Sequence, residues 1–326
     1  MRFGIVGTNF ISDRFMAGAK HIDDFRLVSV CSFREERAKC FAERYGAENI
    51  FTSYEEMAKS GTIDAVYIAT PNVLHCGQTL TFLDNGIHVL CEKPFASNLK
   101  EVEIMIDKAR EKEVMLMEAM IPTTMPNFSV IKDNLYKIGK VRRAVLNFGK
   151  YSSRYDAYRE GTILNAFKPE LSNGSVMDIG VYSLYNAIAL FGAPQHVYAN
   201  AVMLQSGVDG IGTVIMSYGD KEVILMHSKI TDSRIVSEIQ GEDGTIIIDN
   251  VNSIEKVKLH KRNSEVENLG VEQLEDNMYY ELDEFINCIK SGQLESKVNS
   301  HEISKEVHRI MTEIRKQIGL VFEADR

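Results

Sequence analysis

The sequence lacks several features that would each point to a particular class of protein. It has no tryptophan, and with six prolines in 326 residues most of the chain is free to form regular helices and strands. No apolar run approaches the roughly 20 residues that a membrane-spanning helix needs. The first residues lead into an expected strand rather than into the basic and then apolar order of a signal peptide. We therefore expect a cytoplasmic protein that does not contact a membrane.

Cysteine is scarce and scattered. The five cysteines are odd in number, lie far apart and form no C-x-x-C pair, which indicates free thiols in a reducing compartment. Cys91 lies beside a lysine motif described below, but a cysteine within a buried strand is usually a small apolar residue rather than a nucleophile. The eight histidines include no H-x-x-x-H pair, so the sequence predicts no metal site.

Positive charge is in the minority. The 37 lysines and arginines face 46 acidic residues, for a net charge of -9, and no basic stripe is present. Nucleic acid is therefore not an expected partner. A hydrophobic fraction of 44% and a charged fraction of 25% are typical of a globular protein, and the length suits two domains.

The amino-terminal part alternates short apolar runs with helix-like segments. Strands are predicted at residues 2–6, 25–31, 65–69, 87–91 and 114–117, with helices between them such as 35–45 and 99–112. This alternation predicts an α/β fold with a doubly wound parallel sheet of the Rossmann type. We place this domain at residues 1–120.

The rest of the chain, residues 121–326, shows a different pattern. Strands are predicted at residues 141–148, 196–204, 212–218, 222–230, 234–240, 245–248 and 256–260, joined by short turns. Consecutive strands indicate an α+β domain with a large, mostly antiparallel open sheet. Two amphipathic helices follow near residues 278–289 and 303–314, and the last can pack back on the first domain. An open sheet with one uncovered face also predicts a homodimer.

The turn after the first strand is a candidate dinucleotide site. It opens a helix whose free amide groups could face a pyrophosphate. The turn consists of Gly7, Thr8, Asn9, Phe10 and Ile11. Asn9 and Ser12 replace the second and third glycines of the usual fingerprint; asparagine tolerates a left-handed backbone and serine is small. A cofactor turn and a plain strand-to-helix turn both remain open.

The end of the second strand favours NADP(H) over NAD(H). An NAD site usually carries an acidic residue there, whereas this chain has Ser32 followed by Arg34. A hydroxyl and a guanidinium suit a 2'-phosphate. The alternative is that Arg34 belongs with Arg37 and Lys39 to an exposed helix start.

Thr70, Asn72 and His75 follow the next predicted strand. Their position at the same sheet edge suits a contact with nicotinamide. A structural interpretation is also open, because Asn72 can cap the following helix and a lone histidine early in a helix often has a structural role.

Glu92, Lys93 and Pro94 end the strand at residues 87–91. Proline ends the strand because it lacks a donor for the ladder, so Lys93 is expected at the carboxyl end of the sheet. An amine beside an apolar wall is partly desolvated, which disfavours its charged form and lets it exchange protons near neutral pH. The alternative is an ordinary solvated lysine.

Asp178 and Tyr182 lie near the start of a predicted helix. At i and i+4 they share one helix face, where a carboxylate and a phenol could bind a hydroxylated ligand. The structural alternative is a dipole partner in the first turn and a half-buried aromatic ring.

Taken together, the segments 7–11, 70–75, 92–94 and 178–182 resemble the Gfo/Idh/MocA family, and most closely its branch of glucose-fructose oxidoreductase and dimeric dihydrodiol dehydrogenase. The resemblance spans nearly the whole chain. It implies NAD(P)-dependent hydride transfer on a sugar, polyol or related cyclic alcohol. By the same resemblance Lys93 and Tyr182 are catalytic, Asp178 lines the substrate site, Glu92 belongs to the cofactor motif, and the Lys93–Pro94 peptide is cis.

In the mechanism that this resemblance implies, a hydride passes between C4 of the nicotinamide and a carbinol carbon while Tyr182 or Lys93 exchanges the hydroxyl proton. Two departures from the family leave other functions open: Asn9 in the first turn, and the segment 121–126, where relatives carry other residues. The departures motivate the alternative of a non-catalytic dinucleotide-binding sensor. An NAD-dependent glycosidase is a further alternative that the resemblance implies, because the family's fold also hosts hydrolysis through transient oxidation.

Overall fold

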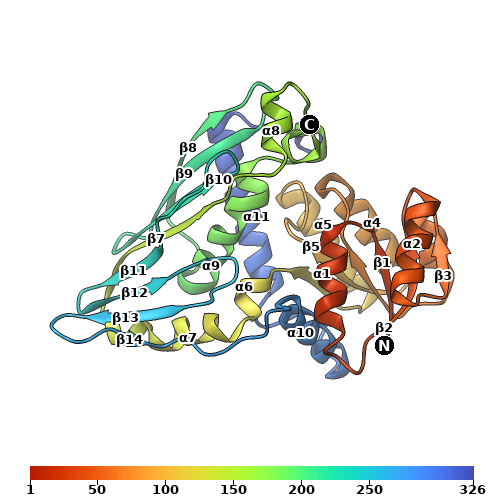
Figure 1. Cartoon of the computed structure of the whole chain (residues 1–326), viewed down its shortest axis with the longest axis horizontal. Helices are drawn as coiled ribbons and strands as arrows, with labels where there is room; N and C mark the ends of the chain where they lie inside the picture. Colours follow the sequence, from red (N-terminus) through yellow and green to blue (C-terminus); the bar gives the residue numbers. More distant parts are fainter. The chain divides into compact units, whose positions relative to one another are not determined.

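The computed structural model describes residues 1–326, and the chain divides into two units (Figure 1). The first unit contains Met1–Met120 and Leu274–Ser304, and the second contains Ile121–Gln273 and Lys305–Arg326. The segment Leu274–Ser304 thus returns to the amino-terminal unit.

A six-stranded parallel sheet forms the centre of the first unit. Its strand order is β3-β2-β1-β4-β5-β6, which is the doubly wound order with the chain reversal between β1 and β4. The predicted Rossmann sheet is therefore confirmed. The strands are β1 (Arg2–Val6), β2 (Arg26–Cys31), β3 (Asn49–Phe51), β4 (Ala65–Ile68), β5 (His88–Glu92) and β6 (Leu116–Ala119).

The helices of this unit connect and cover those strands. They are α1 (Phe10–Ala19), α2 (Glu35–Tyr45), α3 (Tyr54–Lys59), α4 (Asn72–Asp84), α5 (Leu99–Lys112) and α10 (Met278–Lys290). Helices α1 and α10 approach closely, since a Cβ on Gly18 would lie 2.6 Å from the backbone nitrogen of Tyr279. Between these helices and the sheet, Phe15 stacks on Tyr67 with ring centroids 3.8 Å apart.

An eight-stranded sheet dominates the second unit. Its order is β14-β13-β12-β11-β7-β10-β9-β8, and every neighbouring pair is antiparallel except β7 with β10. The expectation of a large, mostly antiparallel sheet is confirmed. The strands are β7 (Val141–Gly149), β8 (His196–Met203), β9 (Asp209–Ser217), β10 (Glu222–Ser228), β11 (Ser237–Gly241), β12 (Gly244–Ile248), β13 (Val257–Lys261) and β14 (Glu267–Asn268).

One face of this sheet is covered by helices and the other is not. In Figure 1, α9 (Val181–Phe191) and the part of α11 (His301–Ile318) that belongs to this unit lie along one face, and no helix covers the other. The remaining short helices are α6 (Ile121–Thr124), α7 (Pro126–Asn134), η1 (Leu135–Ile138), α8 (Tyr155–Arg159), η2 (Asn165–Phe167), η3 (Pro169–Leu171), η4 (Val176–Gly180) and η5 (Glu323–Asp325).

Three local features differ from the expectations drawn from the sequence. Strands β3 and β14 were not predicted, because segments of three and two residues are too short to show an alternation of apolar and polar side chains. Residues 176–180 form a π-helical turn, η4, before the α-helix α9 begins at Val181, so the α-helical spacing assumed for Asp178 and Tyr182 does not hold through this turn. Asn72 is the first residue of α4 and not its cap, a position that Pro71 occupies. No helix is both long and apolar enough to span a bilayer.

Candidate active site

The carboxyl ends of the parallel strands bring four candidate segments of the first unit to one edge of its sheet. Gly7 follows β1, Ser32 follows β2, Thr70 lies just beyond β4, and Lys93 follows β5. In a doubly wound sheet this edge is where ligands bind, beside the chain reversal between β1 and β4.

The turn after β1 is built around Gly7. Its φ of 101° is in the left-handed region, and a Cβ there would lie 2.4 Å from the carbonyl oxygen of Ala69. The turn can therefore pack this closely against the end of β4 only because residue 7 has no side chain. Ser12 holds the turn together, since its Oγ donates a hydrogen bond to the Gly7 carbonyl at 2.7 Å. A backbone cradle at the start of α1 fits a pyrophosphate group.

Asn9 has a different role from the one expected. Its backbone is extended, with φ of -107°, so its tolerance of the left-handed region is not used. Its Oδ1 accepts from the backbone nitrogen of Ile11 at 2.8 Å, and its Nδ2 donates to the Ala69 carbonyl at 2.7 Å. Asn9 therefore caps α1 and ties it to the end of β4. Thr8 and Ile11 beside it are half-buried, and Phe10 is 64% exposed.

Ser32 and Arg34 lie at the entrance to α2. Arg34 is the N-cap residue of α2, and its side chain is exposed. The backbone nitrogen of Arg34 lies 3.4 Å from Oγ of Ser32, a long contact that leaves the hydroxyl weakly held. Ser32 and Arg34 thus both lie at the start of α2, and the contact between them is made by the Arg34 backbone.

His75 braces two loops of the sheet edge. The ring is fully buried, with Nδ1 2.9 Å from the Pro94 carbonyl and Nε2 2.9 Å from the Thr70 carbonyl. Burial lowers the pKa of His75, although both carbonyls favour the charged ring. Thr70 is fixed further by a 2.7 Å hydrogen bond from its Oγ1 to Gln78.

Lys93 is half-buried at the end of β5, and the Lys93–Pro94 peptide is cis, as the family resemblance implied. Glu118 holds the loop that follows. It accepts from the backbone nitrogen of Phe95 at 3.0 Å and from Oγ of Ser304 at 2.7 Å. The loop that carries Lys93 is thus anchored by a buried carboxylate on β6.

Behind Lys93 lies a buried acidic group that the sequence did not reveal. Tyr67 donates a hydrogen bond to Glu92, and Glu281 of α10 is fully buried with no hydrogen-bond partner for either carboxyl oxygen. Burial raises the pKa of Glu92, against the lowering effect of Lys93. Burial, and then the Glu92 charge, raise the pKa of Glu281 well above its ordinary range. Lys93 therefore stands next to carboxyl groups whose pKa values are raised by burial.

In the second unit, Asp178 and Tyr182 occupy the junction of η4 and α9. Oδ2 of Asp178 lies 2.8 Å from Nζ of Lys229, and the Asp178 side chain is 37% exposed. The half-buried ring of Tyr182 meets Phe148 of β7 edge to face, with centroids 5.5 Å apart. A carboxylate and a phenol are thus held on rigid elements, each against a defined neighbour.

A buried polar cluster fixes the π-helical turn that carries Asp178. Asp209 accepts from the backbone nitrogen of Val176 at 2.7 Å, and His227 lies 2.9 Å from Oγ of Ser175. The imidazole fits closely, because a Cβ on Gly212 would lie 2.7 Å from it. Burial lowers the pKa of His227, with Asp209 opposing. This cluster is structural, since none of its groups reaches solvent.

Four residues of these arrangements escaped the sequence analysis: Tyr67, Glu118, Lys229 and Glu281. Tyr67 and Glu118 lie within short strands, and Glu281 occupies a core position of α10. The one signal in the sequence was a polar residue at a position where the hydrophobic pattern predicts burial. Such a residue means either that the pattern was misread or that the side chain has a specific role.

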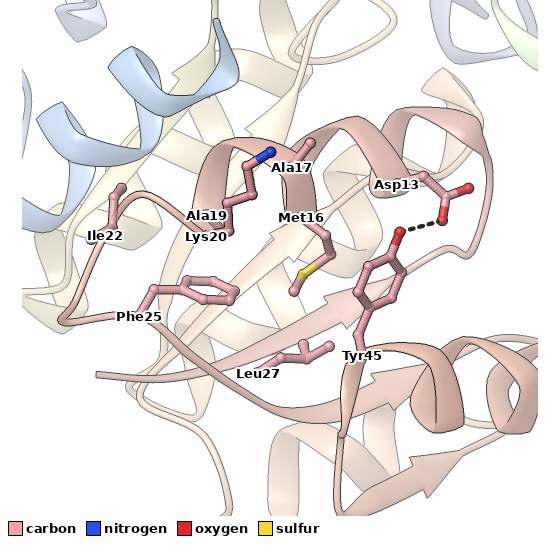
Figure 2. A pocket seen from close by; sticks show the side chains of 9 residues that line it. All are labelled: Asp13, Met16, Ala17, Ala19, Lys20, Ile22, Phe25, Leu27 and Tyr45. Atoms are coloured by element: carbon pink, nitrogen blue, oxygen red, sulfur yellow. Dashed lines mark hydrogen bonds between the residues drawn. The ribbon is translucent and has the colours of Figure 1, made fainter. Parts of the chain in front are cut away.

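A hollow of about 550 Å³ opens elsewhere on the first unit, among α1, β2 and α2 (Figure 2). Its polar wall is the pair Tyr45 and Asp13, joined by a 2.8 Å hydrogen bond, and Phe25, Leu27 and Met16 give an apolar floor. None of the candidate residues lines it, so we assign it no part in the site.

Comparison with known proteins finds relatives over the whole length of the chain. Residues 1–120 match the model of an oxidoreductase family with an NAD-binding Rossmann fold, and residues 136–247 match the GFO/IDH/MocA C-terminal domain. The chain is 53% identical over 326 residues to scyllo-inositol 2-dehydrogenase (NADP(+)) IolU of Bacillus subtilis (strain 168), which covers 100% of this chain and 99% of that protein. It is 28% identical to trans-1,2-dihydrobenzene-1,2-diol dehydrogenase of Danio rerio, over 100% of this chain and 99% of that protein.

Among solved structures, KijD10, a 3-ketoreductase from Actinomadura kijaniata crystallised with NADP and TDP-benzene, superposes with a TM-score of 0.87. The alignment covers 98% of each chain at 23% identity. At that identity the likeness shows a shared fold.

Proposed function

The chain belongs to the GFO/IDH/MocA family of oxidoreductases, and on that premise we propose that it transfers a hydride between NADP(H) and a ring carbon of a cyclic polyol such as an inositol. It is an NAD(P)-dependent oxidoreductase acting on CH–OH groups. The observation that carries the choice of substrate is the full-length identity of 53% to an inositol dehydrogenase. The dihydrodiol relative also acts on a ring with neighbouring hydroxyls, as its name states.

We assign the first unit to the cofactor. The turn at Gly7 and the amino-terminal end of α1 would hold the pyrophosphate, and Thr70 and Asn72 would lie towards the nicotinamide. Ser32 and Arg34 support NADP(H), because a hydroxyl and a guanidinium can bind a 2'-phosphate. The NADP(+) in the name of the inositol dehydrogenase supports the same choice.

We assign proton transfer to Lys93 and Tyr182, and substrate orientation to Asp178. The bound cofactor would supply or accept the hydride. Lys93 is half-buried and directly follows the buried Glu92, whose pKa is raised by burial, and this placement supports a part in proton exchange. Asp178 pairs with Lys229 and is partly exposed, so it can accept a hydrogen bond from a substrate hydroxyl.

We propose a cytoplasmic protein, and the uncovered face of the second sheet supports a homodimer. Tyr198, Ile215, Ile224 and Val145 form one row across β8, β9, β10 and β7, since each pairs with the next in register. Tyr198 is 60% exposed and Ile215 is 40% exposed. An apolar row of this kind favours pairing with a second copy. Light scattering should give twice the chain mass, and Ile215→Lys should give single chains.

The decisive assay follows NADPH absorbance with the purified protein and a panel of inositols, free sugars and dihydrodiols, each with NADP⁺ and with NAD⁺. We expect turnover of at least one inositol, with NADP⁺ preferred. Arg34→Ala should weaken the binding of NADP⁺ about tenfold or more and leave the binding of NAD⁺ unchanged. Arg37→Ala, in the same helix, is the matched control.

The variants Lys93→Met and Tyr182→Phe separate chemistry from binding. Lys93→Met should remove turnover and leave NADPH binding, measured by fluorescence, nearly intact. Tight NADPH binding without turnover of any panel member would favour the sensor instead. Release of a sugar from a glycoside without net change in NADPH would favour the glycosidase.

A further inference from the structure

Lys229 is a buried lysine that neither the sequence motifs nor the assigned roles explain. It directly follows β10, and its side chain is only 2% exposed. A lysine so completely buried is rare, because its ammonium group loses its hydration. Its neighbours within the second unit therefore show what it is for.

Three groups surround the ammonium. Nζ lies 2.8 Å from Oδ2 of Asp178, donates to the carbonyl oxygen of Ala166 at 2.9 Å, and stands 5.2 Å from the ring centroid of Phe167. The carboxylate is thus held by a charge-assisted hydrogen bond, and the aromatic face adds an attraction for the cation. These contacts join two separate stretches of chain, η4 and η2.

The pair is unequal in its exposure. The Asp178 side chain is 37% exposed, so water alone would stabilise its charge, whereas the lysine is removed from water almost completely. A buried ion pair seldom adds net stability over apolar side chains of the same size. What the ammonium adds to Asp178 is a fixed direction for its carboxylate.

The same lysine also anchors an aromatic wall, which we define as Tyr151, Tyr155, Tyr158 and Phe167. Tyr155 and Tyr158 pack on Phe167 with centroids 5.6 Å and 5.2 Å apart, and Tyr151 meets Tyr155 edge to face. Phe167 is fully buried under the ammonium, and the three tyrosines are half-buried. The backbone of Lys229 contributes too, because its carbonyl accepts from Ser152 at 2.9 Å.

We propose that Lys229 is a positioning residue for polyol recognition, which fixes the Asp178 carboxylate and the aromatic wall relative to each other so that both meet the substrate ring together. The inference rests on the proposed function. It also specifies the substrate class: a carboxylate whose charge is balanced by Lys229 accepts hydrogen bonds from a neutral hydroxylated ring and offers no surplus positive charge to an acidic or phosphorylated sugar.

The test is a cycle of Lys229→Met, Asp178→Asn and the double variant, assayed with scyllo-inositol and NADP⁺. Lys229→Met should raise KM for the inositol by about 10- to 100-fold, since a small misplacement of a binding group has effects of that size. KM for NADP⁺ and the affinity for NADPH should stay unchanged. If Lys229 acts through Asp178, the double variant should lose no more activity than Asp178→Asn alone.

Stability gives a second, independent measurement. Asp178→Asn should lower the melting temperature, because it leaves the buried ammonium without a counter-charge, and adding Lys229→Met should restore part of that loss. The matched control is Lys221→Met, which removes a lysine that also contacts an aspartate, Asp220, and faces the ring of Tyr218, but whose side chain keeps 23% of its surface exposed against 2% for Lys229. It should leave both KM values unchanged.

Losses that multiply in the double variant, or an unchanged KM in Lys229→Met, would overturn the inference. If Lys229→Met does not fold, Lys229→Arg keeps the charge but alters the contact with Ala166, and a wild-type KM in that variant would count against the proposal. Wild-type protein that turns over no member of the panel would instead refute the proposed function, before any variant is compared.

Discussion

Tyr67 donates a hydrogen bond to the carboxyl group of Glu92, and both side chains are buried between the parallel sheet and its covering helices. The phenol stacks on Phe15, so its direction is fixed by packing. Glu92 immediately precedes Lys93 in the chain. A buried carboxyl group next to the catalytic candidate is therefore held by one specific donor.

Tyr67→Phe removes that donor with little change of shape. Burial already raises the pKa of Glu92, and the Tyr67 hydrogen bond lowers it, so the variant should raise the Glu92 pKa further. We expect a loss of about 1–3 kcal/mol in the free energy of unfolding. The loss should grow from pH 5 to pH 8, because the folded variant resists losing the Glu92 proton while the unfolded chain does not. Urea titrations at both pH values measure it.

The control for this variant is Tyr45→Phe. Tyr45 donates to Asp13 at 2.8 Å at the rim of the hollow shown in Figure 2, where Arg44 also contacts Asp13 at 2.9 Å. Because the Asp13 carboxylate keeps a partner and access to water, Tyr45→Phe should lose less than about 1 kcal/mol in the free energy of unfolding. Equal losses in the two variants would contradict the role given to Tyr67.

Glu281→Gln tests whether the unpartnered carboxyl of α10 is protonated in the folded protein. Its pKa is raised well above the ordinary value by burial and by Glu92, against Arg14 and Lys93. A raised pKa means that the stabilising effect is complete below the unfolded pKa of about 4.3 and is lost as the pH rises towards the folded pKa. Glutamine does not titrate, so the variant should lose less stability than the wild type between pH 5 and pH 8.

The measurement is the free energy of unfolding at those two pH values, with Glu272→Gln as an exposed control that should follow the wild type. Parallel pH dependence of Glu281→Gln and the wild-type protein would show that Glu281 is ionised when folded.

The cysteines should differ sharply in reactivity, since only the thiolate attacks a disulfide reagent. Burial raises the pKa values of Cys31, Cys76 and Cys288 to about 12, and that of Cys91 well above its ordinary range. Cys40 is exposed. We expect one fast thiol per chain with Ellman's reagent and four more after unfolding in urea. Cys40→Ser should abolish the fast phase, whereas Cys76→Ser should leave it, and a second fast thiol would contradict the burial.

Helices and strands that are specified by residues within or next to them could be predicted from the sequence. Helices α2 and α5 begin and end where expected, because Gly46 ends α2 with φ of 75° and Asn98 caps α5 through the backbone nitrogen of Glu101. Their apolar stripes and end signals lie within the helix itself. The parallel, doubly wound type of the first sheet followed in the same way from the alternation of apolar runs with helices, although the three-residue strand β3 was missed.

Features that depend on tertiary contacts could not be predicted. The π-helical turn η4 rests on Asp209 and His227, which belong to strands that follow it in the chain. The partner of Asp178, Lys229, looks in the sequence like any lysine at a strand end. Candidate residues were found by motif, but the groups that hold them required coordinates.

The first turn offers the sharpest separation of cofactor binding from folding. A side chain on Gly7 would meet the backbone oxygen of Ala69 at 2.4 Å, and the φ of 101° disfavours any L-residue. Because the backbone has to shift to make room for the new methyl group, Gly7→Ala should distort the cradle and weaken the binding of NADPH by well over tenfold. Asn9→Ala loses a helix cap worth about 1 kcal/mol and leaves the cradle open. It should lower the melting temperature with only a modest effect on NADPH affinity. Fluorescence titration and thermal melts of both variants distinguish the two roles, and wild-type NADPH affinity in Gly7→Ala would mean that the dinucleotide binds elsewhere.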